Sequence, residues 1–161
     1  MIVIADSAPL NYLVLIGETE LLPTLYGGIV IPTAVLRELR SRGAPALVRE
    51  WANHPPSWLR VERVDPTLLA EMALDLDAGE REAIALARAL QAELVVIDEQ
   101  AGRRDARRWQ LTVTGTLGVL RTAASRGLVD FRAVLDRLQQ TNFYISAELL
   151  QQLLDEDDSN P

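Results

Sequence analysis

Residues 2–7 read Ile2-Val3-Ile4-Ala5-Asp6-Ser7, and this short segment decides the fold. An uninterrupted run of β-branched residues is typical of a parallel strand whose two faces are both buried. The run stops at a carboxylate, which then lies at the carboxyl end of the strand. Comparable apolar runs at residues 29–31 and 94–97 predict further strands, and the segments at 59–64 and 111–113 also read as strands.

Helical patterns fill the intervals between these strands. They are predicted at residues 9–16, 21–25, 33–39, 43–56, 67–74, 80–89 and 102–109, followed after residue 116 by further helices that end with one at 146–154. Parallel neighbours in a sheet need a helix-length connection. The sequence therefore predicts an α/β fold, a three-layer α/β/α sandwich with a central, mainly parallel sheet. We expect one domain over residues 1–161, with a disordered acidic tail from about residue 155.

The composition limits the chemistry. The chain has no cysteine and a single histidine, His54, which excludes disulfides, thiolate zinc sites, cysteine nucleophiles and multi-histidine metal centres. A bound metal would be a hard cation with oxygen ligands, Mg²⁺ or Mn²⁺. The net charge of -7 argues mildly against nucleic-acid binding, unless the acids are gathered around metal. No leader and no apolar run of membrane-spanning length is evident, so we expect a cytoplasmic protein without a membrane partner.

Four acids are placed where they can meet. Asp6 ends the first strand, Asp98 ends the strand at 94–97, Glu38 lies in the helix after the second strand, and Glu80 begins a helix after Gly79. Each alone is equally well explained as a helix cap. In a parallel sheet all four converge on one edge, and packed like charges destabilise a fold unless a cation neutralises them. The pattern therefore favours a divalent metal site.

The order of these motifs resembles the PIN-domain nucleases. The similarity extends over nearly the whole chain and is greatest to the small prokaryotic PIN-like branch related to VapC-type toxins (DUF3368-like), in the segments at residues 4–10, 79–87, 96–99, 102–103, 113–120 and 143–150. The resemblance implies a metal-dependent ribonuclease that uses Mg²⁺ or Mn²⁺. It assigns Asp6, Glu38, Glu80 and Asp98 as both catalytic residues and metal ligands, with the Ser7 hydroxyl beside the first acid.

Several assignments have alternatives. Glu82 is the second choice for the third acid, because residues two apart on a helix lie on different faces and only one can enter the site. Asp77 and Asp105 are interpreted as caps or solvated side chains. For substrate binding we name a further set, whose alternatives are a solvated or salt-bridged helix face for the arginines and a turn and helix cap for the threonines. This set, together with Ser7, is Arg104, Arg108, Thr114 and Thr116.

The resemblance also implies partners. We expect an RNA substrate and, if the chain is the toxin of a type II toxin–antitoxin pair, an antitoxin protein. The apolar residues of the first helix indicate a homodimer or a partner groove. Two other functions remain: an inactive PIN-like binding or regulatory module, which the four acids argue against, and a phosphohydrolase with Asp6 as nucleophile. The latter would carry a second aspartate at position 8, where Ala8 stands.

Overall fold

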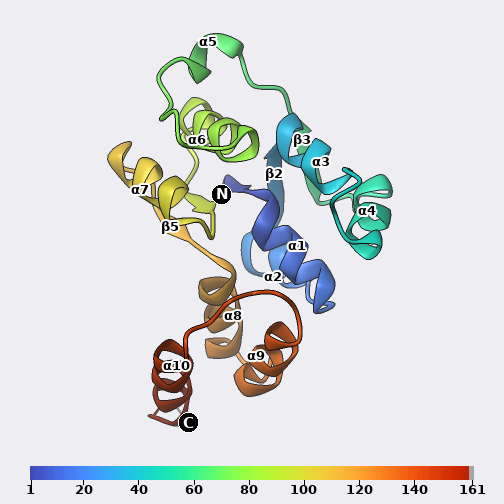
Figure 1. The fold of residues 1–161 in the computed structure, drawn as a ribbon, viewed down its shortest axis with the longest axis vertical. Helices are drawn as coiled ribbons and strands as arrows, with labels where there is room; N and C mark the ends of the chain where they lie inside the picture. The colour runs from blue at the N-terminus through green and yellow to red at the C-terminus, as the bar shows by residue number, and fades with distance from the viewer. Residues whose placement is uncertain (160–161) are drawn as a thin grey trace.

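The computed structural model describes residues 1–159, which contain a five-stranded sheet whose strands are all parallel. The strands are β1 (Val3–Ala5), β2 (Ile29–Pro32), β3 (Leu59–Glu62), β4 (Leu94–Val96) and β5 (Val113–Thr114), in the spatial order β3-β2-β1-β4-β5. Helices flank the sheet on both sides, so the predicted three-layer α/β/α sandwich is confirmed (Figure 1).

The helices connect successive strands and extend the fold after β5. Those before β4 are α1 (Ser7–Leu15), α2 (Leu21–Tyr26), α3 (Thr33–Leu39), α4 (Ala46–Asn53), α5 (Pro66–Leu69) and α6 (Ala78–Leu90). Those after β4 are α7 (Gln100–Arg108), α8 (Thr116–Ser125), α9 (Phe131–Gln139) and α10 (Ala147–Ser159). None of the helices in the described part of the chain is both long and apolar enough to cross a membrane.

Two apolar clusters cover the two faces of the sheet. Val3 and Ala5 of β1 belong to the cluster formed with helices α1, α2, α4, α8 and α9, whereas Ile4 between them belongs to the cluster formed with α6 and α7. Successive side chains of a strand point to opposite faces, so a strand covered on both sides is apolar at every position. This is why β1, β2 and β4 read as continuous apolar runs.

The strand order indicates which edge of the sheet can hold a ligand. In chain order, β2 and β3 lie on one side of β1, and β4 and β5 then lie on its other side. Open parallel sheets bind ligands at the carboxyl ends of the strands, where this reversal opens a crevice. Ala5 is in register with Val96, and Val96 with Thr114. The residues that follow these three positions therefore meet at the same edge.

Several predicted element bounds differ from the structure: the strand predicted at 111–113 is β5 at Val113–Thr114, and the helix predicted at 43–56 is α4 at Ala46–Asn53. The helix expected to reach residue 74 ends at Leu69, although Asp65 caps its start by accepting the Thr67 N–H at 3.0 Å. The tail expected to be disordered from about residue 155 continues α10 to Ser159. Two ion pairs connect these added residues to the rest of the fold, since Arg121 meets Glu156 at 2.6 Å and Arg132 meets Asp158 at 2.7 Å. Residues 160 and 161 of that predicted tail lie outside the described residues.

Candidate metal centre

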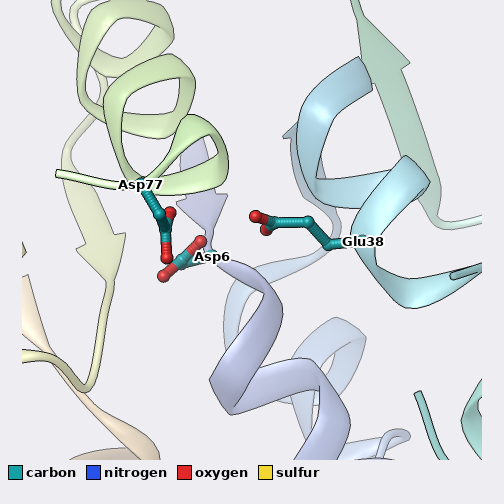
Figure 2. Close-up of side chains that lie close together, drawn as sticks. All are labelled: Asp6, Glu38 and Asp77. Carbon is teal, nitrogen blue, oxygen red and sulfur yellow. The ribbon is translucent and has the colours of Figure 1, made fainter. Parts of the chain in front are cut away.

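Three carboxylates meet at the carboxyl edge of the sheet. Asp6, Glu38 and Asp77 each offer one oxygen such that all three oxygens lie within 4.8 Å of one another. They come from three elements: the end of β1, α3, and the residue that precedes α6 (Figure 2). Carboxylate oxygens at this spacing are suited to a hard divalent cation. Asp6 and Glu38 were predicted as ligands, and Asp77 was not.

Asp6 is the buried member of the group. Its backbone N–H donates to the Val96 carbonyl at 2.9 Å, which extends the pairing of β1 with β4 and fixes the side chain at the strand end. The side chain is 2% exposed, and its Oδ1 has no hydrogen-bond partner. Burial raises the pKa of Asp6 well above its usual value, and the charges of Asp77 and Glu38 raise it further. An unpartnered buried carboxylate oxygen is costly unless a ligand binds it.

Glu38 reaches the group from α3 and is held by two donors. The Ser7 hydroxyl donates to its Oε1 at 3.0 Å, and the Gly79 N–H donates to its Oε2 at 3.3 Å. Burial raises the pKa of Glu38, while the bond from Ser7 lowers it. Ser7 therefore positions the Glu38 carboxylate, and its predicted role in substrate binding stays a prediction.

Asp77 and Glu80 form a capping box at the start of α6. The Asp77 side chain accepts the Glu80 N–H at 2.8 Å, and Glu80 Oε1 accepts the Asp77 N–H at 3.3 Å. These bonds satisfy the free N–H groups of the first turn. Glu80 is 5% exposed, and its Oε2 has no partner. Burial, followed by Asp77, raises the pKa of Glu80 to about 7.

Glu82, the second choice for the third acid, points elsewhere. Its Oε1 accepts the Ala34 N–H at 3.2 Å and the Thr33 hydroxyl at 3.4 Å, so it caps the N-terminus of α3. This contact ties α6 to α3 and leaves Glu80 as the acid of this helix that borders the group. The prediction for Glu80 as a ligand is neither confirmed nor contradicted, since the group within 4.8 Å does not include it.

Asp98 lies at the same edge but is bonded to α8. Its Oδ1 accepts the Thr116 N–H and its Oδ2 accepts the Thr116 hydroxyl, both at 2.7 Å. Burial raises the pKa of Asp98, while the bonds from Thr116 and the charge of Arg103 lower it. Asp98 therefore anchors the N-terminus of α8, and its predicted role as metal ligand and catalytic residue stays a prediction.

Glycines allow the acids to approach the backbone. A Cβ on Gly79 would collide with Glu38 Oε1, one on Gly102 would lie 2.6 Å from Glu80 Oε2, and one on Gly115 would lie 2.7 Å from Asp98 Oδ1. Each acid thus packs against a position that any larger residue would obstruct. These glycines therefore leave room for the carboxylates at this edge of the sheet.

The predicted substrate contacts are differently placed. Arg108 pairs with the buried Asp105 at 3.0 Å and covers the Trp109 ring, so Asp105 is neither a cap nor solvated. Arg104 is exposed on α7. Arg103, which was not predicted, is the arginine beside Asp98, where its guanidinium donates to the Ile97 carbonyl at 2.9 Å.

The two predicted threonines follow Asp98 at the same edge. Thr116 is fully buried and uses its hydroxyl on Asp98. The Thr114 hydroxyl lies where a Cβ on Gly118 would be.

Sequence reasoning missed Asp77 because it treated capping and ligation as alternatives. The segment from Asp77 to Glu80 is a D-x-x-E pattern, which correctly predicts the cap. A cap uses few of the lone pairs that two carboxylate oxygens provide, so the same side chain also contributes an oxygen to the group. The distance from Asp77 to Asp6 and Glu38 depends on tertiary packing, which the local pattern does not encode.

Comparison with known families agrees with this geometry. The DUF3368 family model, described as a PIN domain, matches residues 2–159. The matched range includes every acid described above. No match was found among curated proteins.

Proposed function

The chain belongs to the PIN-domain family, and we propose that it is a Mg²⁺- or Mn²⁺-dependent endoribonuclease that hydrolyses RNA phosphodiester bonds. PIN domains are generally metal-dependent nucleases. Family membership supports the reaction class, while the choice of RNA and of these two ions is our proposal.

The environment of Asp6 is the observation that carries the proposal. Its buried Oδ1 has no partner, and it belongs to a group of three carboxylate oxygens within 4.8 Å of one another. The raised pKa values of Asp6 and Glu38 show that the folded chain alone disfavours their charges. A divalent cation bound by Asp6, Glu38 and Asp77 would satisfy that oxygen and offset the repulsion. The residues present therefore fit the metal that the family uses.

A divalent cation at this edge supplies activation of a water molecule and neutralisation of charge on the attacked phosphate. Hydrogen bonds within the chain position the carboxylates at this edge of the sheet. Ser7 and Gly79 hold the Glu38 carboxylate, and Asp98 fixes the start of α8 through Thr116. We propose that Glu80 and Asp98 border the reacting phosphate as the remaining catalytic acids. The contacts with the rest of the RNA that we propose are those of Ser7, Arg104, Arg108, Thr114 and Thr116.

We also propose a biological setting, which rests on the resemblance to VapC-type toxins. In this setting the chain is the toxin of a type II toxin–antitoxin pair and acts in the cytoplasm as a homodimer. A cationic side chain of the antitoxin would neutralise the same carboxylates that bind metal. A metal-dependent nuclease without such a partner would have another cellular role.

The test is a cleavage assay on matched RNA and DNA oligonucleotides with Mg²⁺, with Mn²⁺ and with chelator. We expect metal-dependent cleavage of RNA, and roughly 100-fold or greater loss in Asp6→Asn and in Glu38→Gln, because ligand loss should exceed the effect of losing an outer-shell partner. Asp136→Asn, an exposed acid on α9, is the matched control. Cleavage that persists in chelator, or that survives Asp6→Asn, would overturn the proposal.

A further inference from the structure

A cleft opens directly beside the acidic group. Its volume is about 350 Å³, and Glu38 and Ser7 form part of its wall, so it is continuous with the candidate metal centre. The volume lies at the lower end of the roughly 300–1,000 Å³ of small-molecule sites. A group bound there would sit next to a phosphate at the metal.

Three distant segments of the chain build the cleft. α1 contributes Asn11 and Tyr12, the segment between α3 and α4 contributes Ser41, and the segment between α9 and α10 contributes Asn142. The Tyr12 hydroxyl donates to Asn142 Oδ1 at 3.0 Å, which joins the first and last of these. The Tyr12 ring also meets Phe143 edge-on, with centroids 4.9 Å apart. The two contacts fix the Tyr12 ring in the wall.

The cleft presents free polar groups of one kind. Asn142 uses its carbonyl oxygen on Tyr12 and leaves its two N–H donors without a partner among residues 1–159. The Asn11 amide makes no hydrogen bond to another residue in that range. The Asn11 amide therefore offers donors and an acceptor in one plane, and Asn142 adds its N–H donors, a pattern that pairs with the edges of nucleobases.

Charge argues for a base in this cleft rather than a phosphate. None of the described residues that line it is an arginine, and its charged member is Glu38. An anionic wall repels phosphate, while neutral amides and a tyrosine ring suit an uncharged, flat heterocycle. Sequence-specific recognition of RNA uses these means on unstacked single-stranded bases.

We propose that this cleft is a nucleobase subsite, which takes the base of a nucleotide next to the scissile phosphate and reads its edge with Asn11 and Asn142. The inference rests on the proposed function, because it places the phosphate at the acidic group. It makes single-stranded RNA the substrate class. It also predicts a preference for one base beside the cut.

The first test measures binding without catalysis. The Asn side-chain amide signals of the full chain are followed by NMR in chelator during titration with adenosine, guanosine, cytidine, uridine or ribose. We expect at least one nucleoside to shift the Asn11 and Asn142 signals saturably, ribose to leave them unchanged, and Asn11→Ala to weaken binding on the order of 10-fold. The exposed Asn53→Ala is the matched control. Unshifted signals, or equal binding by the two variants, would overturn the subsite.

The second test separates reading from support of the fold. Tyr12→Phe removes the hydroxyl bond to Asn142 but keeps the ring and the amide, whereas Asn142→Ala removes the amide itself. On an RNA library with Mg²⁺ we expect Asn142→Ala to lose the base preference and to raise KM more than it lowers kcat, with the preference retained in Tyr12→Phe. An unchanged preference in Asn142→Ala refutes the inference. Absence of wild-type cleavage refutes the proposed function alone, because nucleoside binding is measured independently.

Discussion

Replacing Asp6 with asparagine should abolish the stabilisation of this fold by Mg²⁺. An ion that binds only the folded acidic group stabilises it by RT ln(1 + [L]/Kd), which is about 2.7 kcal/mol at 100 times Kd. In a chain of this length each kcal/mol shifts the melting temperature by about 2–4 °C. Saturating Mg²⁺ should therefore raise the wild-type melting temperature by roughly 5–11 °C.

The structure explains why the substitution should separate metal binding from folding. Asp6 Oδ1 has no partner to lose, and the main-chain bond from residue 6 to Val96 does not depend on the side chain. Asparagine has nearly the same volume and removes a charge that burial and its acidic neighbours disfavour. The metal-free variant should melt at or above the wild-type temperature in chelator, and its response to Mg²⁺ should be nearly flat.

The assay is a thermal melt of wild type, Asp6→Asn and Asp155→Asn, each with a series of Mg²⁺ concentrations and with chelator. Asp155→Asn serves as the control because it removes a charge from the acidic end of α10, the other place where acids gather. It should respond as wild type does. If Asp6→Asn gains as much from Mg²⁺ as the wild type, the ion binds elsewhere and the proposed centre loses its physical basis.

Three further predictions follow from individual contacts. Gly79→Ala should remove the response of the melting temperature to Mg²⁺ and destabilise the fold by about 1–3 kcal/mol, because the added methyl group would displace Glu38. Gly43→Ala is the control and should do neither, because the nearest atom to its added Cβ is 4.0 Å away. Chemical denaturation in chelator should show the free energy of unfolding falling as pH rises from about 4.5 to 7, because with a folded-state pKa of about 7 the Glu80 carboxyl keeps its proton in the folded chain after the unfolded chain has lost it. Saturating Mg²⁺ should flatten this dependence on pH, and a stability that rises over this range would contradict the prediction. Asp98→Asn should lower RNA cleavage and lower the stability by about 1 kcal/mol, because it weakens two bonds to Thr116, and a gain in stability would show that charge repulsion dominates at this acid.

Much of the fold could be predicted from local pattern. The strand at residues 2–5 is apolar at every position because both faces of the sheet are covered, so its sequence states its environment directly. The cap of α10 is equally local, since the Ser146 hydroxyl accepts the Leu149 N–H at 3.1 Å. The helix continues past the predicted end at Leu154 to Ser159, where its residues pair with Arg121 and Arg132, which lie far away in sequence. Contacts of this range leave no periodic signal.

The candidate site shows the same division at finer scale. The predicted strand ends located the edge where Asp6 and Asp98 lie, because parallel strands in register end together. Which acids lie together depends on side-chain direction: Asp98 turns to Thr116, while Asp77 caps α6 and still reaches the group. Capping α6 and lying in the acidic group are therefore compatible for one side chain in this fold. A carboxylate fixed by capping keeps lone pairs free and loses little side-chain entropy when a cation binds, so capping preorganises the site rather than competing with it.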